Sequence, residues 1–174
     1  MLYINQRKYP DMPYQHNLKH GGAPADKSNI SSAGCGLCCL CMVVENMTMH
    51  SFSLEECRQM VYDLKANMSA GSDLQIMGPA VAEKFGLTYD QTDDINKMLA
   101  HVHAGGMAVA NSGGDREGYE GVFTHGGHYS WWFPPTRHRP ASLTRRWSPA
   151  SLTPRAERAR WKSTSRLLTA TSPF

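Results

Sequence analysis

Residues 31–47 read Ser-Ser-Ala-Gly-Cys-Gly-Leu-Cys-Cys-Leu-Cys-Met-Val-Val-Glu-Asn-Met. Small residues followed by an unbroken apolar run predict a tight loop that feeds a buried helix over about residues 34–48. Cys35 falls in the first turn, where unpaired N–H groups and the positive end of the helix dipole favour a thiolate. The glycines on each side are expected to let a substrate backbone approach the sulfur. Cys35 is therefore either a nucleophile or a small hydrophobic residue of a buried helix.

Two more helices have clear start signals. Ser53 opens Ser-Leu-Glu-Glu, in which Glu56 completes a capping box. Asp73 can cap the next helix, and Gly86 ends it. The apolar positions that we expect to face inward are Leu54, Cys57, Val61, Leu64, Met68, Leu74, Met77, Val81 and Phe85.

The spacing of apolar residues changes from helical to strand-like in the second half of the chain. Residues 87–89 predict a short strand, and Thr92 or Asp93 opens a fourth helix, whose Ile95, Leu99 and Val102 face inward and which ends at residues 105–106. Residues 107–111 are typical of a buried strand, and a glycine-rich loop then leads to a strand that begins near residue 128. A helical half followed by the beginning of a sheet indicates the α+β class.

The composition changes abruptly after Tyr129. Residues 1–129 hold nine Lys and Arg and fourteen Asp and Glu, a balance of −5, whereas residues 130–174 hold nine and one, a balance of +8. All fifteen glycines and all ten methionines precede Tyr129. We therefore divide the chain into a domain of residues 1–129 and a basic, Pro- and Arg-rich segment of residues 130–174.

Residues 130–174 are expected either to be disordered or to be translated out of frame. Ser130-Trp-Trp becomes Ile-Val-Val if its codons, preceded by A, are read one base earlier, and this would continue the strand. The nucleotide sequence tests the idea, because one alternative frame after Tyr129 must then encode a glycine-punctuated β pattern.

Length and cysteine usage restrict the compartment. A chain of 174 residues suits one domain, no apolar run approaches the ~20 residues of a membrane span, and no segment resembles a signal peptide. Four of the five cysteines crowd into seven positions, which does not resemble a disulfide framework. We expect a cytoplasmic protein, or a secreted one if the start lies downstream of a lost leader.

A thiol nucleophile needs a base and an oxyanion stabiliser. His128 is the candidate base because it follows two glycines at the start of a predicted strand; His125 is the reserve. Gln6 can donate its side-chain amide to an oxyanion beside the backbone N–H of Cys35. Gln6 lies in residues 1–33, which prolines and glycines predict to be extended and rich in turns. A lone histidine or glutamine is more often structural, so the order of the three residues carries the argument.

The sequence resembles a known family at these residues. Asn5-Gln6-Arg-Lys-Tyr-Pro, Ala33-Gly-Cys35-Gly and Gly126-Gly-His128-Tyr resemble the papain-like cysteine peptidases that process double-glycine leaders of bacteriocin precursors, and in particular their standalone relatives. The resemblance covers residues 3–129. It implies a papain-like fold with an N-terminal helical half and an incomplete antiparallel sheet, and peptide hydrolysis through a thioester on Cys35, with His128 as base and Gln6 in the oxyanion hole.

This sequence departs from the family pattern at one point. The pattern requires an Asp or Asn after the strand that begins at the histidine, and residues 130–174 contain neither. Loss of this orienting group costs on the order of 10⁴ in rate in serine peptidases. A catalytically impaired peptide-binding domain is therefore the main alternative.

Other functions fit less well. Cys35 and Cys38 have the spacing of a thioredoxin-type redox pair, but residues 1–30 are too broken by Pro and Gly for the βαβ unit that precedes such a pair. Cys41 points away from the helix face of Cys35, Cys38 and Cys39, so the four cannot surround one metal ion. The expected partner is a peptide or protein substrate, with no cofactor, no metal, no membrane and no specific nucleic acid. A catalytic Cys35 is expected to react with iodoacetamide at mildly acidic pH far faster than the other cysteines.

Overall fold

The computed structural model describes residues 1–15, 28–67, 71–121 and 125–134, together with the backbone of residues 167–171. Its elements, in chain order, are η1 (Gln6–Lys8), α1 (Ile30–Ala33), α2 (Cys35–Met47), α3 (Leu54–Asp63), α4 (Leu74–Phe85), β1 (Thr88–Thr92), α5 (Ile95–His103), β2 (Met107–Ser112), β3 (His128–Trp132) and β4 (Leu167–Thr171). Among these residues, no helix is long and apolar enough to cross a membrane.

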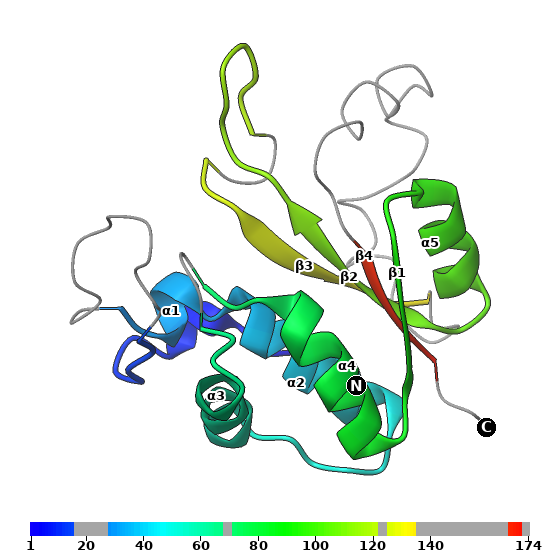
Figure 1. The fold of residues 1–174 in the computed structure, drawn as a ribbon, viewed down its shortest axis with the longest axis horizontal. Helices are drawn as coiled ribbons and strands as arrows, with labels where there is room; N and C mark the ends of the chain where they lie inside the picture. The colour runs from blue at the N-terminus through cyan, green and yellow to red at the C-terminus, as the bar shows by residue number, and fades with distance from the viewer. Residues whose placement is uncertain (16–27, 68–70, 122–124, 135–166, 172–174) are drawn as a thin grey trace.

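The strands form one antiparallel sheet in the order β1-β4-β2-β3 (Figure 1). In the register of β2 and β3, Ser112 lies opposite His128 and Ala108 lies opposite Trp132. The α+β class expected from the sequence is confirmed. β3 is an edge strand of this sheet, so the first residue of β3, His128, lies at a sheet corner.

Side chains on the two faces of the sheet belong to two apolar clusters. Met107 and Val109 of β2 pack in the main core with α2, α3 and α4, together with Tyr129 and Trp131 of β3. Ala108, Ala110 and Trp132 form a smaller cluster with Met98 and Val102 of α5. Because alternate strand residues point to opposite faces, α2 and α4 cover one face and α5 the other (Figure 1).

The cap signals of α3 and α4 are confirmed. Ser53 Oγ accepts the N–H of Glu56 at 3.2 Å, and Glu56 Oε2 accepts the N–H of Ser53 at 2.8 Å. Asp73 accepts the N–H of Gln75, and Gly86 ends α4 in the left-handed conformation at φ 66°.

The apolar stripe of α3 was predicted too long. The helix ends at Asp63, and Leu64 is 38% exposed rather than buried. Lys65 takes the left-handed φ of 53° and turns the chain. Met68 lies outside the described residues.

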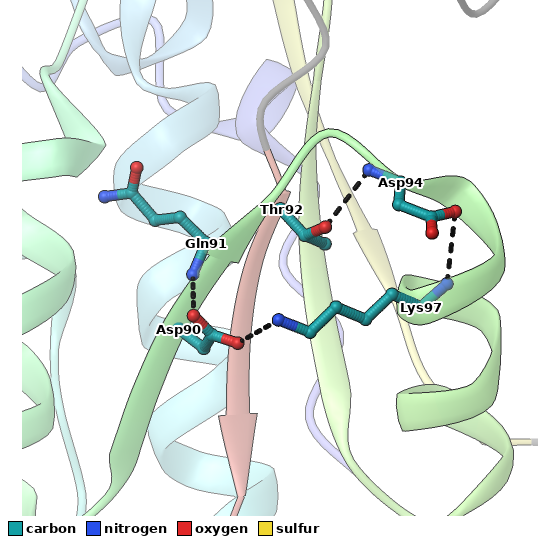
Figure 2. Close-up of polar contacts among 5 residues, drawn as sticks. All are labelled: Asp90, Gln91, Thr92, Asp94 and Lys97. Atoms are coloured by element: carbon teal, nitrogen blue, oxygen red, sulfur yellow. Dashed lines mark hydrogen bonds and ion pairs between the residues drawn. The ribbon is translucent and has the colours of Figure 1, made fainter.

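The helix predicted to open at Thr92 or Asp93 opens instead at Asp94. The Asp94 carboxylate accepts the N–H groups of Asn96 and Lys97, while Thr92 Oγ1 accepts the N–H of Asp94. Lys97 Nζ reaches back to Asp90 Oδ2 at 2.7 Å (Figure 2). Of the residues predicted to face inward, Val102 is buried, whereas Ile95 and Leu99 are partly buried.

Two short helices interrupt the N-terminal segment that was predicted to be extended. Asn29 caps α1 in a capping box with Ser32, and Asn5 caps η1. Elements of three or four residues carry no periodic signal, so the sequence pattern did not reveal them. Residues 21, 22 and 24, which supported the prediction, lie outside the described residues.

The boundary predicted after Tyr129 falls inside β3, which continues to Trp132. Trp131 Nε1 in this part of β3 is buried and has no partner among the described residues. Such an unsatisfied donor costs about 1–3 kcal/mol and is rare in native strands. Farther along, β4 lies between β1 and β2, while residues 135–166 and 172–174 are outside the described part.

Candidate active site around Cys35

Cys35 is the first residue of α2, as the sequence predicts. A single residue, Gly34, joins α1 to α2, being the C-cap of one helix and the N-cap of the other. Its N–H donates to the carbonyl of Ile30 at 2.9 Å. Cys35 is partly buried, whereas the other four cysteines are buried. The helix start thus leaves one thiol of the α2 cluster within reach of solvent.

The two glycines beside Cys35 serve internal packing rather than substrate approach. A Cβ at Gly34 would lie 2.7 Å from the Ile30 carbonyl oxygen, which excludes a side chain there unless the backbone moves. A Cβ at Gly36 would lie 3.2 Å from Leu74 Cδ2 and 3.3 Å from Tyr129 Cδ2. The expectation that these glycines open the site is therefore wrong.

The start of α2 lies against the start of β3. The backbone amide of Tyr129 faces the Cys35 sulfur and favours its thiolate form, as do the amides of Gly36 and Cys35 itself. Burial outweighs these amides and raises the pKa of the Cys35 thiol above its ordinary value of 9.0. This pKa shift is opposite in direction to the one expected from the helix dipole, because desolvation of the sulfur is the larger effect.

His128 is one peptide bond from the amide that faces the sulfur. The structure therefore brings the backbones of Cys35 and His128 together. Burial lowers the pKa of the half-buried His128 ring below 6.5, so the ring is neutral at pH 7. Strand alternation places this ring on the side of β3 opposite the Tyr129 side chain, and it makes no hydrogen bond with any described residue, Cys35 included.

The reserve histidine has a different role. His125 Nδ1 lies 2.9 Å from Asp115 Oδ2, and the Asp115 N–H donates to the His125 carbonyl at 2.9 Å. The Gly121 N–H and then His125 hold the pKa of Asp115 below its usual value. This exposed pair closes the loop between β2 and β3, so His125 has a carboxylate partner, whereas His128 makes no hydrogen bond with a described residue.

Gln6 lies beside the turn that leads into Cys35. Its Nε2 donates to the carbonyl of Ser31 at 2.9 Å, and Ser31 N–H donates to the carbonyl of Tyr9 at 3.2 Å. One hydrogen bond uses one of the two amide hydrogens. The second N–H of Gln6 makes no hydrogen bond with a described residue.

Sequence reasoning missed a buried polar group under the site. The Tyr14 hydroxyl lies 2.6 Å from Ser72 Oγ and donates to the Gly71 carbonyl at 3.1 Å. Ser72 Cβ lies 3.4 Å from the position of a Cβ on Gly36. Burial raises the pKa of Tyr14, which therefore stays protonated and ties the loop before α4 to the N-terminal segment. Ser72 of this loop lies against the start of α2. No local motif marks these residues, because they meet only in the folded chain.

Cys38 is poorly suited to serve as a redox partner of Cys35. Burial raises the pKa of Cys38, the proposed redox partner of Cys35, to about 12. Among the described residues, no group of three or more His, Cys, Asp or Glu side chains is arranged to hold a metal ion.

Comparisons of the chain with protein-family models, with curated proteins and with solved structures find no match. The assignment of a function therefore depends on the residues and geometry described above.

Proposed function

We propose that this chain is a papain-like cysteine peptidase in which Cys35 is the nucleophile, His128 the general base and Gln6 an oxyanion donor. The observation that carries the proposal is the contact of the Cys35 sulfur with the backbone amide next to His128. This proximity joins two motifs that are far apart in the sequence. Gln6 supports the proposal because its side chain is bound to the Ser31 carbonyl of α1, the helix that leads into Cys35.

The chemistry follows from the resting protonation states. A neutral thiol and a neutral imidazole allow His128 to accept the proton as the sulfur attacks the substrate carbonyl. The Cys35 backbone N–H and the free N–H of Gln6 stabilise the tetrahedral oxyanion. The imidazolium then protonates the leaving amine, which leaves a thioester on Cys35. Water hydrolyses the thioester, with His128 again as base, and the thiol is regenerated.

A second candidate, a peptide-binding domain without activity, is supported by the His128 ring. The ring makes no hydrogen bond with a described residue, and it lies across β3 from Tyr129. Without an orienting partner, it must turn around the edge of the strand to reach the sulfur. Whether the His128 ring makes this motion distinguishes a working peptidase from a binding domain.

Cleavage of a quenched fluorescent peptide with a central Gly-Gly pair tests the proposal. The resemblance to double-glycine peptidases selects this probe. We expect cleavage by the wild-type chain, none by Cys35→Ala, and a loss on the order of 10⁶ in kcat for His128→Ala, the size seen when a serine peptidase loses its histidine base. His125→Ala is the matched control and should retain activity. Cleavage that survives Cys35→Ala contradicts the peptidase, and binding of the peptide without cleavage supports the second candidate.

A further inference from the structure

Cys41 of α2 and Cys57 of α3 are two thiols at the contact between these helices. Both side chains have 0% exposure. Neither takes part in the peptide chemistry proposed for Cys35, so the inference drawn from them does not depend on that function.

The two thiols are placed reciprocally. Cys41 Sγ donates to the Ser53 carbonyl at 3.6 Å, and the same carbonyl accepts the N–H of Cys57 at 3.0 Å. Cys57 Sγ donates to the Leu37 carbonyl at 3.9 Å, and in α2 this carbonyl is four residues before Cys41. Each sulfur therefore lies against the helical turn that bears the other.

This reciprocal placement brings two cysteines of facing helices to one contact, which an intramolecular disulfide requires. The interaction with the Cys57 side chain and then burial raise the pKa of Cys41, and the nearby carboxylates of Glu45 and Glu56 act in the same direction. Cys41 therefore rests as a protonated thiol, and its reaction with an oxidant is slow at neutral pH.

We propose that Cys41 and Cys57 form a redox-convertible pair that a small organic disulfide closes to an intramolecular disulfide. One cysteine attacks the reagent, which releases one reagent thiol and leaves a mixed disulfide. The second cysteine attacks the protein sulfur of that mixed disulfide and releases the second reagent thiol. Two cysteine thiols are oxidised, the reagent disulfide is reduced to two thiols, and the two cysteine protons end on those thiols.

The bond would connect α2 to α3 and close the chain between residues 41 and 57. Cross-links of this kind stabilise a fold mainly by restricting the unfolded chain. Oxidation is therefore expected to raise the urea midpoint of unfolding, whereas an unlinked chain keeps its midpoint.

The test oxidises the Cys35→Ala chain with hydroxyethyl disulfide, since this background removes the most accessible thiol. Proteolysis after Glu45 and Glu56 places Cys41 and Cys57 on different fragments. Mass spectrometry without reductant should find the two fragments joined and lighter by two hydrogens than their sum, and reductant should separate them.

Two further variants in the Cys35→Ala background identify the cysteine that pairs with Cys57. Cys41→Ala should abolish the joined species, while Cys39→Ala, which removes another buried cysteine of α2, should retain it. Failure to form the joined species in the Cys35→Ala chain, or its persistence in Cys41→Ala, overturns the proposal.

Discussion

Cys35 shows how far the sequence determines a reactive residue. The pattern of glycines and apolar residues correctly places it at the start of a helix. It does not reveal the protonation of the thiol, because the burial that raises its pKa arises only in the folded chain. Local motifs thus predict the position of this thiol, and tertiary contacts decide its protonation.

The pH dependence of cleavage follows from the shifted pKa values of His128 and Cys35. The pKa of His128 is lowered below 6.5, so its base form is lost only as the pH falls below that value. The pKa of Cys35 is raised above 9.0, so the thiol keeps its proton through neutral pH. We expect kcat/KM for the Gly-Gly peptide to be flat between about pH 6.5 and pH 9. An alkaline limb below pH 9 would contradict this, because it would indicate an imidazolium that must stay protonated.

The rate at which iodoacetamide labels Cys35 depends on the same raised pKa. This revises the fast labelling at mildly acidic pH that the helix dipole predicts. In the unliganded chain, alkylation of Cys35 by iodoacetamide should be slow at mildly acidic pH and rise with pH, since only the thiolate reacts. Cys35 should still label first, because the other four cysteines are buried. Peptide mapping after timed labelling measures both effects, and rapid labelling of Cys35 at pH 5 would show that its thiolate is stabilised after all.

At the scale of helices and strands, local signals predict where an element starts better than where it ends. The starts of α3 and α4 follow from Ser53 and Asp73, whose side chains cap nearby N–H groups. The end of α3 has no such signal, because Lys65 rather than glycine adopts the left-handed turn. A residue that does not favour this conformation gives the sequence pattern nothing to detect.

The capping box of α3 has a measurable effect on stability. Ser53→Ala removes the acceptor for the Glu56 N–H and should lower the free energy of unfolding by about 1 kcal/mol. Urea denaturation monitored by circular dichroism measures the change. Glu55→Gln is the control, since this neighbouring side chain makes no hydrogen bond with a described residue, and its effect should be a few tenths of that size. An effect of Ser53→Ala no larger than that of Glu55→Gln would show that the cap adds no more stability than one neighbouring charge.

For the molecule as a whole, the sequence predicts the class but not the strand order. The α+β class follows from a helical half and then a change of period. The sheet order β1-β4-β2-β3 places a strand from residues 167–171 between two strands from the first part of the chain. No local pattern indicates such a pairing, because it joins segments that the change in composition separates.

A truncation tests whether the C-terminal segment belongs to the fold. A chain that ends after Phe133 lacks β4 and leaves facing edges on β1 and β2. Such unpaired edges favour aggregation, so this chain should lose cooperative thermal unfolding or melt well below the full chain. A chain that ends after Thr171 is the control and should melt like the full chain. An unchanged melting curve after the longer truncation would show that β4 is dispensable.

The one-residue connection between α1 and α2 has a consequence for any change in chain length. A helix advances about 100° per residue, so one amino acid inserted at Gly34 would rotate the sulfur of Cys35 by more than a quarter turn about the axis of α2. The thiol would then move away from the Tyr129 amide, even if the rest of the fold accommodated the inserted residue. Point changes near Gly34 alter local packing, whereas an insertion changes the direction in which the Cys35 thiol points.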